Sequence, residues 1–243
     1  MTATHIVMGA HGGIGWRLTE MLADKGETVL ATARDKDTIE NLAGFSTVNT
    51  ASLDIENTDV IEEVIGAASE DSDGIKGLAY CIGSINLKPF KAAKDSDYLK
   101  SYELNLLGAV RALRAAEAGL KKANGSVVLF STIAVQQGFA NHALISSAKG
   151  AVEGLTKAVA AEWAPKVRVN AIAPSLSDTP LAKPLTSSEQ MAKSIAAMHP
   201  IPRLGTADDS AAMAAFLMSE ESSWITGQVL HIDGGRSTLR TKG

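Results

Sequence analysis

The sequence predicts an α/β fold: one Rossmann-like domain built on a doubly wound parallel sheet of about seven strands, with helices on both faces. Two observations predict this fold. Short apolar runs alternate along the chain with longer stretches whose apolar residues recur at helical spacing. The short runs are also too apolar to leave one side of a sheet in water, as expected of parallel strands covered on both faces.

The first half of the chain supplies the first four strands. The run THIVMG at residues 4–9 is expected to be a strand because it is apolar and ends in glycine. The stretch AHGGIG follows, and then an amphipathic helix that Gly26 ends. The same order repeats along the chain. It predicts strands in ETVLATAR, STVNTASLDI and GIKGLAYCIG, with helices over residues 36–43 and 59–68 between them.

The second half continues the alternation with longer helices. We expect helices over residues 95–123 and 141–164, and strands over residues 126–131, 167–173 and 228–233. The intervening segment 174–203 holds five of the seven prolines. Since a long excursion after a strand end is a usual position for a substrate lid, we expect the lid here. Its leucines and methionines suit an apolar substrate, and His199 and Arg203 are candidates to meet an anionic group.

Composition limits the classes of function. With 243 residues, of which 45% are hydrophobic, the chain is expected to form one domain over residues 1–243. A net charge of -4 with scattered Lys and Arg argues against nucleic acid or a membrane as a partner. Cys81 is the only cysteine, which excludes an intramolecular disulfide and a cysteine-based metal site, and no metal is predicted. Without a signal peptide or an apolar run of about 18 residues, a cytoplasmic protein is expected.

The turn after the first strand predicts a dinucleotide site. Gly9, Gly13 and Gly15 have the spacing G-x-x-x-G-x-G where a strand ends and a helix begins. Glycines let the backbone approach a pyrophosphate, whose charge the helix N-terminus meets. A tight turn without a ligand is the alternative. His11 and Ile14 lie in the same turn and belong to the predicted cofactor site.

Arg34 at the end of the second strand favours NADP(H) over NAD(H). The adenosine ribose is read at this point of such a fold, and an Arg can pair with the additional phosphate of NADP. Asp35 follows directly, and an acidic residue here would instead accept hydrogen bonds from the ribose hydroxyls of NAD.

Motifs over nearly the whole chain resemble the short-chain dehydrogenase/reductase family. They are the glycine turn, Lys149 near the start of the helix over 141–164, the segment NAIAPSLSDTPLA and the terminus ITGQVLHIDGG. The resemblance implies that Lys149 holds the nicotinamide ribose, that Asp54 contacts the adenine and that Thr179 lies near the carboxamide. It also implies a cofactor role for Gly83 and a water-ordering role for Asn105 beside the lysine.

The catalytic residues depart from the family at one position. The family places a Tyr four residues before the Lys as proton donor, and here that position is Ile145. A Ser thirteen residues before the Tyr corresponds to Thr132, with Ser131 beside it. The enoyl reductases of the family carry their Tyr seven residues before the Lys, and in that register the residue is His142. A histidine can exchange a proton around neutral pH, but His142 could equally bond only the backbone at the helix start.

Two functions follow from this resemblance. The first is an NADP(H)-dependent oxidoreductase that acts on a carbonyl or acyl compound, 3-oxoacyl or enoyl, with an atypical proton donor. The alternative is a catalytically silent relative that binds a dinucleotide or serves as a scaffold subunit. The family resemblance also implies a homotetramer or dimer formed through the two long helices over 95–123 and 141–164.

Overall fold

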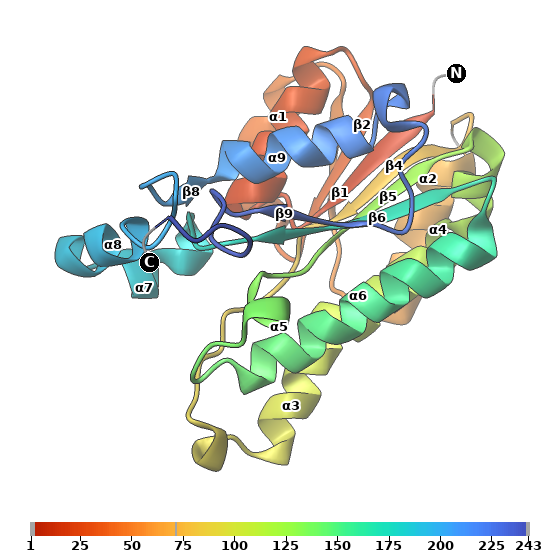
Figure 1. The fold of residues 1–243 in the computed structure, drawn as a ribbon. Helices are drawn as coiled ribbons and strands as arrows, with labels where there is room; N and C mark the ends of the chain where they lie inside the picture. Colours follow the sequence, from red (N-terminus) through yellow and green to blue (C-terminus); the bar gives the residue numbers. More distant parts are fainter. Residues whose placement is uncertain (1–2, 71, 242–243) are drawn as a thin grey trace.

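A computed structural model describes residues 3–70 and 72–241, and it confirms the single α/β domain with a seven-stranded sheet. The strand order is β3-β2-β1-β4-β5-β6-β9, and all neighbours pair in parallel (Figure 1). The strands of this sheet are β1 (Thr4–Met8), β2 (Val29–Ala33), β3 (Val48–Ser52), β4 (Ile75–Tyr80), β5 (Ser126–Phe130), β6 (Arg168–Pro174) and β9 (Val229–Ile232). Because the order reverses between β1 and β4, the carboxyl ends of these two strands flank the point where doubly wound folds bind dinucleotides.

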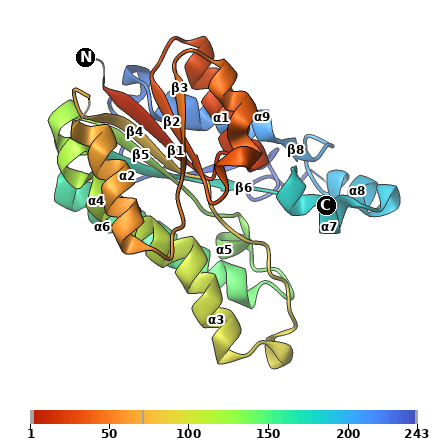
Figure 2. The ribbon, with the colours of Figure 1, turned by 180° about the vertical axis from the view of Figure 1, so that it is seen from behind.

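Helices cover both faces of the sheet (Figures 1 and 2). One face carries α1 (Gly13–Asp24), α9 (Ala207–Leu217) and the 3-10 helix Lys36–Gly44. The other carries α2 (Thr58–Glu70), α4 (Gly108–Ala123) and α6 (Ala143–Trp163). A separate hydrophobic core fills each interface, which explains why every residue of β1 and β5 is buried.

The helix predicted over residues 95–123 is interrupted. It consists of α3 (Asp95–Tyr102), a π-helical stretch Glu103–Leu107 and α4. The widened turn contains Asn105, whose side-chain amide donates to the carbonyl of Ser101 at 2.9 Å. Such bulges inside helices are frequent at functional sites. The element predicted over 36–43 is a 3-10 helix, begun by Asp35, whose side chain accepts from the amide of Asp37.

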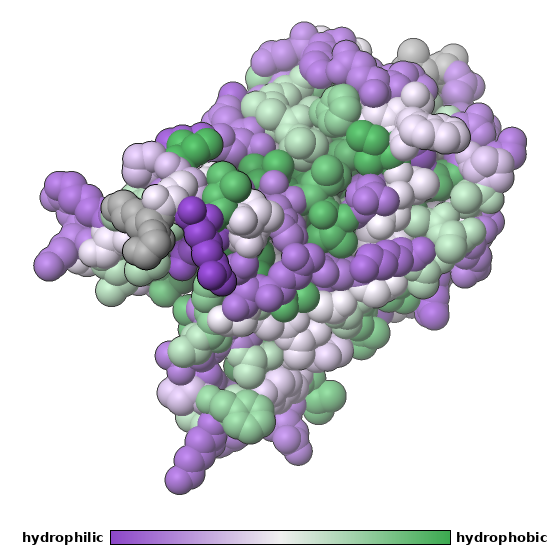
Figure 3. Space-filling model, in the orientation of Figure 1, coloured by the Kyte–Doolittle hydropathy of each residue, from purple (hydrophilic) through white to green (hydrophobic). Residues whose placement is uncertain are grey.

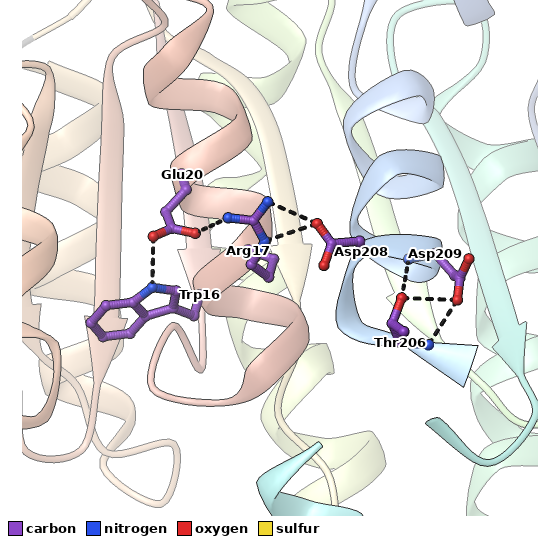
Figure 4. A network of polar contacts seen from close by, with 6 residues as sticks. All are labelled: Trp16, Arg17, Glu20, Thr206, Asp208 and Asp209. Atoms are coloured by element: carbon purple, nitrogen blue, oxygen red, sulfur yellow. Dashed lines mark hydrogen bonds and ion pairs between the residues drawn. The ribbon is translucent and has the colours of Figure 1, made fainter. Parts of the chain in front are cut away.

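The predicted lid segment 174–203 contains short elements: β7 (Ser177–Asp178), α7 (Lys183–Thr186) and α8 (Glu189–Ala196). The sequence analysis missed α9, which follows β8 (Gly205–Thr206). Thr206 and Asp209 form a capping box at its start, a signal that the sequence carries as Thr-x-x-Asp. Asp208 on the same turn pairs with Arg17 of α1 at 2.7 Å and so ties the two helices together (Figure 4).

One edge of the sheet is open in this chain. β9 ends the strand order, and all four of its residues are only half-buried. Figure 3 shows apolar side chains gathered in the middle of the face where Figure 1 places β9 and α9. No helix within the described residues is both long and apolar enough to cross a membrane.

Candidate functional site

A cavity of about 430 Å³ opens at the carboxyl ends of β4, β5 and β6. Residues after these strands form one side, and the start of α6 and the lid form the rest. Its walls are largely apolar. Within the described chain no Asp or Glu lines this cavity, and its Lys and Arg side chains are Lys149 and Arg236. A concave apolar site with a few polar groups at this edge of a doubly wound sheet is where such folds bind ligands.

The glycine turn has the geometry expected for a phosphate cradle. Gly9 has φ +80°, and a Cβ on Gly15 would lie 2.4 Å from the carbonyl oxygen of Gly9, so neither position accepts a side chain. No side chain caps the first turn of α1. The backbone amides at the start of this helix can therefore donate to an anion such as a phosphate. Ile14 lines the cavity, and a Cβ on Gly13 would touch Thr179 of the lid at 3.1 Å.

Three predicted cofactor residues lie outside the cavity on the same edge of the sheet. His11 is exposed in the glycine turn, Arg34 is exposed after β2, and Asp54 is exposed after β3. Among the described residues the Arg34 guanidinium has no partner. The carboxylate of Asp35, in contrast, accepts from the Asp37 amide at 3.1 Å. Asp35 thus caps the 3-10 helix, and the Arg34 guanidinium has no partner among the described residues.

Lys149 lies at the deep end of the cavity with 6% of its surface exposed. Burial lowers the pKa of its ammonium group to about 8, although the nearby Cys81 opposes this. Burial also raises the pKa of the Cys81 thiol to about 12, so it is a neutral thiol at physiological pH. A Cβ on Gly83 would stand 3.1 Å from Oδ1 of Asn105 and 3.3 Å from Nζ of Lys149. The absence of a side chain at Gly83 thus keeps the space beside the lysine open.

Asn105 packs under this space. Its amide donates to Ser84 Oγ at 3.3 Å, and its Oδ1 accepts from the Ser84 backbone amide at 3.4 Å. The π-helical turn brings the buried side chain of Asn105 next to Gly83. Asn105 is therefore a positioning residue of the loop after β4.

The two hydroxyl residues after β5 have different roles. Ser131 donates to Oε1 of Glu153 at 2.6 Å, and both residues are buried. The hydroxyl proton of Ser131 is thus bound by Glu153, which lies on α6 one turn after Lys149. Thr132 lines the cavity and accepts from the Ala134 amide at 3.3 Å, which leaves its own O–H free to turn toward a substrate. Of the two, Thr132 is placed to bind a carbonyl oxygen.

His142 and Ile145 both line the cavity at the start of α6. Nδ1 of His142 lies 2.8 Å from the carbonyl oxygen of Ala140, and the ring meets Phe139 edge to face at 5.3 Å. Because a carbonyl only accepts, Nδ1 carries the proton and Nε2 is left for another partner. Ile145 is 5% exposed and adds an apolar side chain to the cavity wall.

The cavity therefore brings together a subset of the predicted residues: Ile14, Gly83, Ser131, Thr132, His142, Lys149 and Thr179. Sequence reasoning missed Glu153 and Arg236. Glu153 carries no signal, because its role depends on the facing β5. Arg236 follows the turn after β9, and no local pattern shows that this turn reaches the cavity. The described residues contain no group of three His, Cys, Asp or Glu that could hold a metal ion.

Comparison with known proteins agrees with this geometry. A family model described as enoyl-(acyl carrier protein) reductase matches residues 9–237. The 3-oxoacyl-(acyl-carrier-protein) reductase FabG of Vibrio cholerae is 31% identical over 234 residues, 95% of each chain. The L-xylulose reductase of Bos taurus is 30% identical and covers 95% of this chain and 94% of its own. The structure of ElxO with NADP bound has a TM-score of 0.91, with 30% identity over 98% of this chain and 100% of that chain. These matches show that the chain belongs to the short-chain dehydrogenase/reductase family of oxidoreductases, which bind a nicotinamide dinucleotide.

Proposed function

We propose that this protein is an NADPH-dependent reductase of carbonyl compounds in which His142 replaces the missing tyrosine as proton donor. The observation that carries the proposal is that His142, Thr132 and Lys149 line one cavity, while Ile145 occupies the usual donor position. A 3-oxoacyl or enoyl thioester is the first substrate class to test, since FabG is among the relatives.

The cofactor residues present fit NADP(H). The glycine turn and the uncapped start of α1 suit a pyrophosphate, and the partnerless Arg34 suits the phosphate on the adenosine ribose. Lys149 reaches the open space beside Gly83, where it would hold the nicotinamide ribose. When bound, the reduced nicotinamide supplies a hydride to the substrate.

In this mechanism, side chains of the protein bind and protonate the carbonyl oxygen of the substrate. Thr132 donates a hydrogen bond to the carbonyl oxygen and so orients the carbon for attack. The negative charge that develops on the oxygen is neutralised by a proton from Nε2 of the His142 imidazolium, while the carbonyl of Ala140 fixes the ring through Nδ1–H. The apolar walls exclude water from the reacting centre.

The decisive experiment follows NADPH oxidation with a 3-oxoacyl thioester, an enoyl thioester and a small diketone. His142→Ala should lower kcat by about a hundred- to ten-thousand-fold, the usual effect of removing a positioned acid. NADPH binding, measured by fluorescence on the same samples, should be unchanged because His142 lies away from the glycine turn. Lys157→Ala, at an exposed position of α6 outside the cavity lining, is the control.

A silent, dinucleotide-binding subunit is the alternative, favoured by the apolar Ile145 in the donor position. It predicts that the wild type binds NADPH without turnover. Under this alternative Ile145→Tyr alone would create activity, because it returns a phenol to a site that still holds Lys149. Turnover by the wild type that persists in His142→Ala would contradict the proposed donor.

We also propose that the protein forms a homo-oligomer. The half-buried edge strand β9 and the apolar side chains around it would be covered if two copies met at this face.

A further inference from the structure

Arg236 stands at the cavity without a direct ion pair to any described residue. It follows the turn after β9, is only partly exposed, and lines the cavity together with the lid. In the described chain no carboxylate lies within ion-pair distance of its guanidinium, and no Asp or Glu lines the cavity. An arginine stays charged under all physiological conditions, so this part of the cavity is positive, and the charge of Asp233 acts on the guanidinium without a direct ion pair.

The side chain is held in place by two contacts. Its guanidinium carbon lies 4.9 Å from the ring centroid of Phe139, and its Nη2 donates to Sδ of Met198 at 3.4 Å. Both neighbours also line the cavity. These contacts leave Nε and Nη1 without a partner among the described residues, so the guanidinium keeps free N–H groups for a ligand.

Arg236 lies on a tight turn that hydrogen bonds hold in place. Gly234 and Gly235 have φ +61° and +84°, and the amide of Arg236 donates to the carbonyl of Asp233 at 3.2 Å. The carboxylate of Asp233 accepts from the amides of Gly235 and Ser237, at 2.9 and 2.8 Å. The oxygens of Asp233 thus bond the turn and form no ion pair with the guanidinium, although the charge of Asp233 partly offsets that of Arg236.

The other basic residues on the lid side are already engaged. Arg203 pairs with Asp209 at 2.7 Å, so the expectation that it meets an anionic substrate group is not supported. His199 is buried, with Ser175 2.8 Å from Nε2 and the carbonyl of Ile195 2.9 Å from Nδ1. Lys149 lies beside the predicted ribose position. Among the Lys and Arg side chains that line the cavity, Arg236 is therefore the one left for the substrate, while His142 serves the reacting oxygen.

We propose that Arg236 selects substrates that carry an anionic oxygen group, a carboxylate or a phosphate, on an apolar chain that bears the reacting carbonyl. Leu181, Leu185 and Ile195 of the lid provide the apolar wall for that chain. Burial in the cavity strengthens the pairing, because the surroundings screen less than water does. This inference deepens the proposed reductase function and rests on the same cavity.

The test measures binding without turnover. Octanoate, monoheptyl phosphate and methyl octanoate share a heptyl chain and differ only in the head group, so their affinities are compared by calorimetry with and without saturating NADP⁺. The wild type should bind at least one anion about ten- to a hundredfold more tightly than the neutral ester, the effect of a hydrogen-bonded charge. The preferred anion distinguishes a carboxylate from a phosphate.

Three variants distinguish the effect of the Arg236 charge on ligand binding from any effect on folding. Arg236→Gln should abolish the preference, and Arg236→Lys should keep part of it because the charge remains but the planar fork is lost. Arg240→Gln removes an exposed Arg on the same segment outside the cavity and should behave as the wild type. Thermal unfolding checks that all variants fold.

Equal affinity of the wild type for all three ligands, absent binding, or a preference that survives in Arg236→Gln would each overturn the inference. NADPH oxidation with the neutral diketone reports the proposed function separately. Turnover of the diketone without any anion preference would leave the reductase in place and remove only the role of Arg236.

Discussion

Replacing Lys149 with Met should stabilise the cofactor-free protein while it weakens cofactor binding. Lys149 is buried, no carboxylate of the described chain pairs with it, and burial lowers its pKa to about 8. In an unfolded chain a lysine titrates near pH 10.4. Because one pKa unit corresponds to about 1.4 kcal/mol, the charged lysine costs the fold about 3 kcal/mol below pH 8. Met has a similar length and carries no charge.

The benefit of Lys149→Met should depend on pH. Between about pH 8 and about 10.4 the unfolded chain binds more protons than the folded one, so the stability of the wild type rises with pH in this window. The cost of the buried charge is therefore full below pH 8 and falls to less than about 1 kcal/mol near pH 10. The free energy of unfolding of Lys149→Met should exceed that of the wild type by up to about 3 kcal/mol at pH 7 and by much less at pH 10.

Urea unfolding at pH 7 and pH 10, without cofactor, measures this difference. Lys157→Met, an exposed lysine on the same helix, is the control and should change stability by less than about 0.5 kcal/mol at either pH. NADPH fluorescence on the same samples should show binding lost only in Lys149→Met. A variant that is less stable than the wild type at pH 7, or whose advantage is the same at both pH values, would refute the reasoning.

Two further predictions concern single contacts. Arg34→Ala should weaken NADPH binding by about tenfold or more and leave NADH binding unchanged, because the guanidinium would meet only the additional phosphate; fluorescence titration checks this, and equal losses for both cofactors would place Arg34 elsewhere. Thr206→Ala should lower the free energy of unfolding by about 1 kcal/mol by removing the N-cap of α9. Urea unfolding measures it, with the exposed Thr238→Ala as the unchanged control.

Local rules predicted those parts of the protein that depend on few neighbours. The alternation of apolar runs and helical stretches predicted the sheet because parallel strands must be buried on both faces. The turn from Gly9 to Gly15 was predicted because no side chain fits the tight backbone, as the 2.4 Å approach at Gly15 confirms. Lys149, Thr132 and His142 were predicted from the resemblance to the family and not from local rules, and all three line one cavity.

The remaining features depend on contacts between distant segments. The π-helical turn at Asn105 is fixed by Ser84 on the loop after β4, which no helical periodicity can show. Ser131 was predicted to act at the substrate, yet Glu153 on the facing helix holds its proton. Arg236 lies almost a hundred residues beyond Phe139, on which it rests. Only α9 had an overlooked local signal, in the capping box of Thr206 and Asp209.

Two buried residues of the cavity, Ile145 and Lys149, differ in what their burial does to the stability of the fold. Ile145 is apolar and buried in an apolar cavity, whereas the charge of the buried Lys149 destabilises the folded chain. Only a ligand that meets Nζ in the space beside Gly83 offsets that cost. A protein that had lost its cofactor would gain stability from many substitutions at Lys149. The buried lysine therefore argues for a bound dinucleotide.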